Sequence, residues 1–223
     1  MVKKTFPSPD FKWTEKIWQA AEGLVSPKAA EREKALDYLI DLGALVKSPL
    51  IAYLLATRLS DPDLEVRYHV VQALGSVLPG NERGIEMLDP ILMQLQSYLA
   101  YINTDQVLDL LEVSEQYLSA EENLIKIFKL SSYAGNRLSG IVNDRKKPLE
   151  IRQKAIFFCG EIGYLETSTT LKILVSRIEK RNQLLTRSPF RKKELDENQL
   201  YPYAVAALEK LSIGSAAKRE SSL

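Results

Sequence analysis

Residues 61–80 read DPDLEVRYHVVQALGSVLPG, and this stretch decides the fold class. Apolar side chains recur in it at helical spacing on one face, at Val66, Val70, Ala73, Leu74 and Val77. Asp61 offers an N-cap and Pro62 suits a first helical turn, while a Pro-Gly pair ends the pattern. The stretch therefore predicts an amphipathic helix over residues 62–78.

Part of this stretch recurs elsewhere in the sequence. The string LEVR at 64–67 is matched by LEIR at 149–152, and a weaker third copy lies around Arg32. The three arginines that mark the copies are Arg32, Arg67 and Arg152. They lie 35 and 85 residues apart, and the longer interval is about two periods of ~42 residues, a spacing typical of helical arrays.

The periodicity predicts about five antiparallel helix pairs in one domain over residues 11–213, with flexible tails at 1–10 and 214–223. The expected first helices are 11–24, 49–60, 84–101, 120–142 and 168–185. The expected second helices are 27–46, 62–78, 105–118, 148–164 and 199–212. Ser131, Ser132 and Gly135 predict a break or kink in the first helix of the fourth pair. Because one pair alone leaves apolar residues in water, stacking predicts an all-α, right-handed α-solenoid.

The string at 61–67, followed by Ala-Leu-Gly at 73–75, resembles the HEAT-repeat family, especially its short bacterial repeats of the phycobilisome-lyase type. The resemblance implies a HEAT/armadillo-like stack in which the aspartate caps the second helix and the arginine hydrogen-bonds along the stack. These roles fall on Asp61 and Arg67, and on Arg152 in the later copy. It also implies that second helices line a concave face, which the family most often uses to bind proteins.

Composition excludes several classes of protein. A net charge of +1, with 45% hydrophobic and 26% charged residues, is ordinary for a soluble protein and excludes a globally basic nucleic-acid binder. The single cysteine, Cys159, and the single histidine, His69, cannot form a disulfide or a tetrahedral zinc site. A buried Cys159, a reducing cytoplasmic location and no membrane span are expected.

Catalytic motifs are missing as well. The sequence contains no phosphate loop, no Gly-x-Ser-x-Gly, no His-Glu-x-x-His and no Cys-x-x-Cys. We therefore expect no catalytic residues, no cofactor and no metal.

Candidate contact residues lie opposite the apolar stripes of the second helices. They are His69, Gln72, Asp109, Glu112, Lys154 and Phe157. Phe157 is favoured because an exposed aromatic side chain on a groove is a typical anchor for a partner. The loop after the basic run adds Phe190, Arg191, Lys192 and Lys193. The acidic run at 102–125 and the basic run from Lys172 to Lys193 are either solvated surfaces or sites for partners of opposite charge.

Three hypotheses for function follow. The first is a non-catalytic scaffold or adaptor that binds a protein or peptide along the concave face. The alternative is a nucleic-acid-binding protein related to the HEAT-like alkylpurine DNA glycosylases, with contacts in the basic run. The third is an enzyme of the phycobilin-lyase class, whose groove would take a linear tetrapyrrole. The acidic middle of the chain and the N-terminal position of Trp13 and Trp18 argue against the nucleic-acid alternative.

Overall fold

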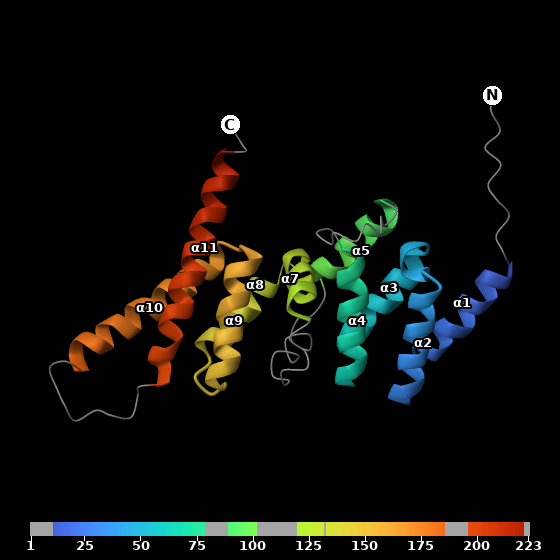
Figure 1. The fold of residues 1–223 in the computed structure, drawn as a ribbon, viewed down its shortest axis with the longest axis horizontal. Helices are drawn as coiled ribbons and strands as arrows, with labels where there is room; N and C mark the ends of the chain where they lie inside the picture. The colour runs from blue at the N-terminus through green and yellow to red at the C-terminus, as the bar shows by residue number, and fades with distance from the viewer. Residues whose placement is uncertain (1–10, 79–88, 102–119, 132, 186–195, 221–223) are drawn as a thin grey trace. The chain divides into compact units, whose positions relative to one another are not determined.

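The structure is a computed structural model that describes residues 11–78, 89–101, 120–131, 133–185 and 196–220. Every regular element in these ranges is helical, which confirms the prediction of an all-α protein. The chain forms two compact units, Met1–Leu99 and Ala100–Leu223. Each unit is described separately below (Figure 1).

The described part of the first unit consists of α-helices and of short 3₁₀ turns at Ala44–Val46 and Arg58–Ser60. Its helices are α1 (Phe11–Gly23), α2 (Ala29–Asp41), α3 (Pro49–Thr57), α4 (Leu64–Val77) and α5 (Asp89–Tyr101). Helix α2 packs against both α1 and α4, and α3 packs against α4. The ring of Tyr53 on α3 meets that of Tyr98 on α5 edge to face, with centroids 4.8 Å apart.

Helix α4 shows how the sequence sets a helix in place. The carboxylate of Asp63 accepts hydrogen bonds from the backbone N–H groups of Glu65 (2.9 Å) and Val66 (3.3 Å), so Asp63 is the N-cap. The prediction that Asp61 caps this helix is therefore wrong. Asp61 instead forms a buried ion pair, because its side chain points back toward α2.

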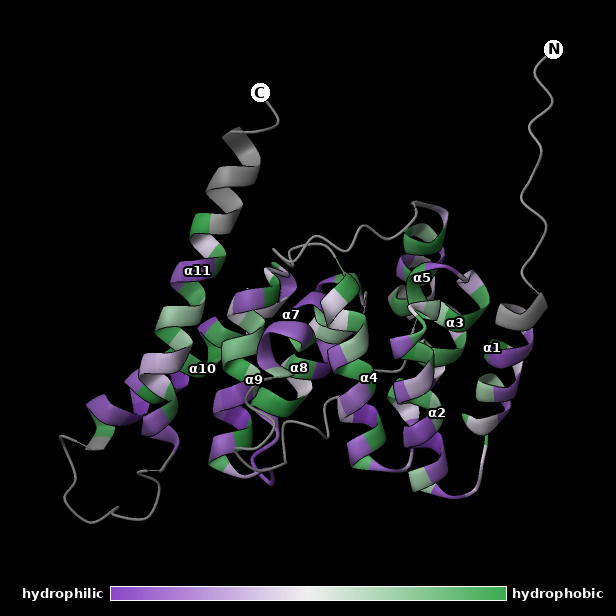
Figure 2. Ribbon diagram, turned by 45° about the vertical axis from the view of Figure 1, so that its right-hand side comes forward, coloured by the Kyte–Doolittle hydropathy of each residue, from purple (hydrophilic) through white to green (hydrophobic). Residues whose placement is uncertain are grey.

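The second unit contains helices of 10 to 20 residues. They are α7 (Glu121–Leu130), α8 (Ala134–Asn143), α9 (Leu149–Ile162), α10 (Glu166–Leu185) and α11 (Tyr201–Glu220), with the 3₁₀ turn η5 (Asp196–Leu200) before the last. Helix α9 packs against α7, α8 and α11, and α10 packs against α8 and α11. Each described helix carries both hydrophobic and hydrophilic residues (Figure 2), and the apolar ones supply the buried core.

The expected helix over 120–142 is two helices, α7 and α8, which confirms the predicted break at Ser131. The hydroxyl of Tyr164 donates toward the carbonyl oxygens of Lys129 and Ser131, each 3.0 Å away. This contact satisfies backbone acceptors that the helix end leaves without an intrahelical partner. Helix α11 runs to Glu220, beyond the expected end at residue 212, where the apolar pattern of the sequence fades.

Helices α9 and α11 approach each other closely at Gly160. A Cβ atom on Gly160 would lie 3.0 Å from the Cα of Ala207, which is tighter than ordinary contact. Beside it, Phe128 and Phe158 meet edge to face at 5.4 Å, and both are buried. Cys159 is also buried, as predicted, and burial raises the pKa of its thiol to about 12.

Candidate functional site

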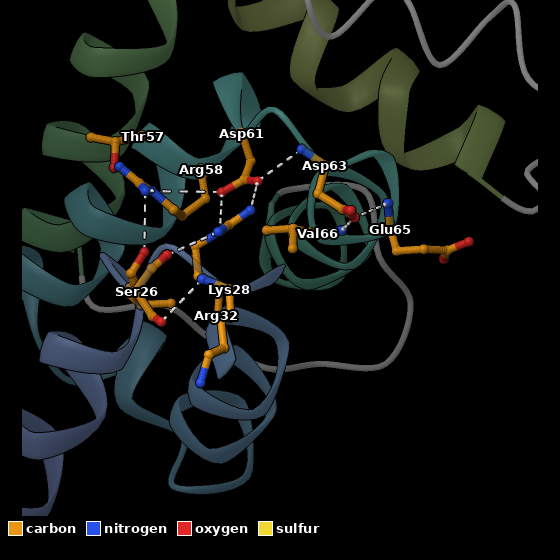
Figure 3. Close-up of polar contacts among 10 residues, drawn as sticks. Ser26, Lys28, Arg32, Thr57, Arg58, Asp61, Asp63, Glu65 and Val66 are labelled. Carbon is orange, nitrogen blue, oxygen red and sulfur yellow. Dashed lines mark hydrogen bonds and ion pairs between the residues drawn. The ribbon is translucent and has the colours of Figure 1, made fainter. Parts of the chain in front are cut away.

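In the first unit, an arginine joins helix α2 to the turn before α4. Arg32 on α2 donates from Nε and Nη2 to the two carboxylate oxygens of Asp61, at 2.9 and 2.7 Å (Figure 3). Its Nη1 donates to the carbonyl oxygen of Ser26 at 2.9 Å. The Asp61 side chain is 0% exposed, so this two-pronged ion pair is shielded from water.

Arg58 completes this group, which we name the Arg32–Asp61 clamp (Arg32, Arg58 and Asp61). Its Nη1 lies 3.9 Å from the Asp61 carboxylate (Figure 3). The same atom donates to the carbonyl oxygen of Leu24 at 3.1 Å. The hydrogen bond to Asp61 is the main cause that raises the pKa of Arg32. The clamp is a structural joint, since its polar groups satisfy one another inside the fold.

A second arginine in an equivalent position acts in the other unit. Arg152 is the fourth residue of α9, as Arg32 is of α2 and Arg67 is of α4. It donates to the carbonyl oxygen of Val142 at 2.9 Å and to the Glu197 carboxylate at 2.7 Å. Glu197 lies in η5, just ahead of α11. Arg152 therefore joins the C-terminal end of α8 to the carboxylate that precedes α11.

Two further arginines, from α10, converge on the same carboxylate. Arg177 donates to Glu197 at 2.8 Å, and Arg181 donates to Glu197 at 3.1 Å and to Asn198 at 2.9 Å. We name the Arg–Glu cluster by its residues, Arg152, Arg177, Arg181 and Glu197. The Nε atoms of Arg177 and Arg181 are buried and have no hydrogen-bond partner among the described residues.

Electrostatics in this cluster are unbalanced. Burial lowers the pKa of Arg177; Glu197 opposes this effect, and the charges of Arg145 and Arg152 add to it. Burial alone would raise the pKa of Glu197, but the hydrogen bond from Arg152 and the surrounding arginine charges outweigh it and lower that pKa. The cluster therefore holds its carboxylate ionised and carries a surplus of positive charge.

The predicted contact residues of the first unit lie on α4. His69 is partly exposed, and its Nδ1 lies 4.0 Å from a carboxylate oxygen of Asp37 on α2. Gln72 is half-buried one turn further along α4. Both side chains are therefore only partly accessible to solvent.

The predicted contact residues of the second unit lie on α9. Lys154 and Phe157 are half-buried. The ring of Phe157 meets that of Phe158 edge to face at 5.4 Å, and the Nζ of Lys210 on α11 lies 5.5 Å from its centroid. Lys210 also pairs with Glu161. We name this surface the α9–α11 face (Lys154, Phe157, Glu161 and Lys210).

The remaining predicted contacts lie outside the described residues. These are Asp109, Glu112, Phe190, Arg191, Lys192 and Lys193. Within the part of the chain that the structure describes, no group of three or more His, Cys, Asp or Glu side chains could hold a metal ion. Among the helices described there, none combines the length and the apolar character needed to cross a membrane.

Sequence reasoning missed the centre of the Arg–Glu cluster. Arg177 and Arg181 belong to the basic run, yet both point at Glu197, which the sequence places 20 and 16 residues away. Their spacing of four residues puts them on one side of a helix. That spacing is the only signal the sequence offered, and it does not identify the carboxylate they share.

No protein-family model matches the chain, and no curated protein matches it. The resemblance to HEAT repeats therefore rests on the sequence strings alone.

Proposed function

We propose that this chain is a non-catalytic binding protein, a HEAT-like α-solenoid that binds a protein or peptide along its second helices. The repeated joint supports the stacked arrangement. In each unit an arginine at the fourth position of a second helix pairs with a carboxylate just before a later second helix, at Asp61 and at Glu197. A joint repeated in this way suits an array of pairs, in which each pair contacts its neighbours.

Phe157 carries the binding proposal. Its ring is held by Phe158 on one side and approached by Lys210 from α11, yet it remains partly accessible. A rigid aromatic side chain that loses little entropy on binding is typical of the residues that dominate interfaces. Charged groups around it, Lys154 and Glu161, supply the polar rim that such anchors have.

Capture of partners from a lysate of the source organism, with identification by mass spectrometry, tests this proposal. Phe157→Ala should lose the partners that the wild-type protein retains. Tyr133→Ala is the matched control, because Tyr133 is an aromatic residue, 50% exposed, that precedes α8 and is not part of the α9–α11 face. Thermal melts by circular dichroism show whether each variant is folded. Equal capture by folded Phe157→Ala and wild type would refute the role of this face.

Nucleic acid is the competing partner. Titration of duplex DNA at several salt concentrations distinguishes the nucleic-acid alternative from the scaffold proposal, because phosphate contacts make the affinity for DNA fall steeply with salt. The scaffold proposal expects weak binding at physiological salt. Nanomolar affinity at about 0.15 M salt, with a slope that implies about six or more neutralised phosphates, would favour the nucleic-acid alternative.

A further inference from the structure

The Arg–Glu cluster contains more positive charge than a structural joint requires. Three guanidinium groups share the single carboxylate of Glu197, which leaves two positive charges without a counter-charge inside the cluster. Arg145, exposed in the turn between α8 and α9, adds a fourth cation whose charge acts on both Arg177 and Glu197.

The Arg32–Asp61 clamp gives an internal comparison. There, Arg32 divides its donors between Asp61 and the carbonyl of Ser26, and Arg58 donates to the carbonyl of Leu24. The contacts equivalent to those of Arg32 are made in the second unit by Arg152 alone, which donates to Val142 and Glu197. Arg177 and Arg181 are additional, and each keeps a buried Nε without an acceptor among the described residues.

The three arginine side chains of the cluster differ in their exposure to solvent. The side chain of Arg152 is 5% exposed and that of Arg181 is 16% exposed, whereas that of Arg177 is 29% exposed. An incoming anion can therefore reach Arg177 and the neighbouring turn that carries Arg145. Partly desolvated arginines repel one another, and an anion placed beside them removes that repulsion.

We propose that the Arg–Glu cluster, together with Arg145, binds a phosphate group. A phosphate monoester carries nearly two negative charges at neutral pH and several acceptor oxygens, which matches two uncompensated guanidinium charges better than a second carboxylate does. The group comes either from free phosphate or from a phosphorylated side chain. This inference does not depend on the α9–α11 face, and the result at Phe157 leaves it unchanged.

Titration calorimetry at pH 7 in about 0.15 M chloride tests the site, with inorganic phosphate in one arm and a phosphoserine peptide in the other. Saturable one-to-one binding is expected in at least one arm, and the tighter arm identifies the source. Arg145→Gln and Arg177→Gln should each weaken binding about tenfold, the loss typical of one hydrogen bond to a charged group. Arg145 is exposed in a turn, so its variant keeps the test valid if Arg177→Gln fails to fold.

Lys180→Gln is the matched control, because it removes one exposed positive charge from the same helix as Arg177 and Arg181. We expect its affinity to stay within about twofold of the wild type, since screened charges act weakly at this salt concentration. Two results would overturn the proposal. One is the absence of saturable binding in both arms. The other is an equal loss in Lys180→Gln and Arg145→Gln, which would indicate diffuse attraction to a basic surface.

Discussion

Replacing Arg32 by alanine tests the Arg32–Asp61 clamp most directly. The substitution removes both donors to Asp61 and the donor to the carbonyl of Ser26. It leaves the Asp61 carboxylate buried, with the backbone N–H of Asp63 at 3.0 Å and Arg58 at 3.9 Å as its nearest polar partners.

The expected loss follows from this geometry. Removing one partner of a buried ion pair costs about 3–5 kcal/mol, because the other charge stays desolvated. Arg58 already lies near Asp61 and can move closer, so we expect the lower end, about 3 kcal/mol. With a urea slope of about 2 kcal/mol per M, the midpoint of unfolding should fall by about 1.5 M.

Urea denaturation at pH 7, followed by circular dichroism at 222 nm, measures this shift. Lys28→Ala is the control, since its ion pair with Glu31 on the same helix is largely exposed and should matter little. A double variant with Asp61→Asn should lose clearly less than the sum of the single losses, because the two groups interact directly. If Arg32→Ala shifts the midpoint no more than Lys28→Ala does, the clamp does not stabilise the unit.

Three further predictions concern the second unit. Glu197 has a lowered pKa, so its ionised form stabilises the fold above the ordinary pKa of 4.5, and this contribution is lost as the pH falls through the lowered pKa. Glu197→Gln should therefore reduce the acid-dependent part of the unfolding free energy, measured by urea titration between about pH 5 and 2. Gly160→Val should destabilise the protein by about 1–3 kcal/mol, because the added atoms meet Ala207, whereas Gly140→Val, with open space around it, should not lower the melting temperature. The buried thiol of Cys159, with its pKa raised to about 12, should react with a thiol reagent only on unfolding, and rapid labelling of the native protein would contradict its burial.

Helical periodicity predicted α2, α4, α9 and α11 because each of these helices buries an apolar stripe. The helices expected over residues 62–78 and 148–164 correspond to α4 (Leu64–Val77) and α9 (Leu149–Ile162) in the structure. The signal was local, since both the apolar spacing and the start residues lie within a few turns of one another. Helix boundaries are less determined, as the extension of α11 to Glu220 illustrates.

The assignment of aspartate roles failed because two acidic residues stand near one helix start. Asp61 and Asp63 both suit an N-cap by residue type, and only the path of the chain shows that Asp63 faces the free N–H groups of α4. Asp61 had a stronger partner in Arg32, 29 residues earlier in the sequence. A pairing over that distance leaves no trace in local periodicity.

The candidate site was predicted only in part. Phe157 was expected to be an exposed side chain on a groove, and the structure shows it half-buried, next to Lys210 from α11. The Arg–Glu cluster depends on Glu197 meeting side chains from two other elements, α9 and α10. Such a convergence is set by tertiary packing, which charge patterning along the chain does not encode.

The placement of the joints also bears on how such a chain can lengthen or shorten in evolution. In both described joints the donor belongs to an earlier helix and the acceptor immediately precedes a later one, Arg32 with Asp61 and Arg152 with Glu197. A duplicated segment that begins with an acceptor carboxylate and ends with a donor arginine would carry a partner for the arginine before it and a partner for the carboxylate after it. Insertion or loss of such a segment would keep each donor opposite an acceptor. A single substitution of the arginine or of the carboxylate would instead leave the other charge buried without its partner.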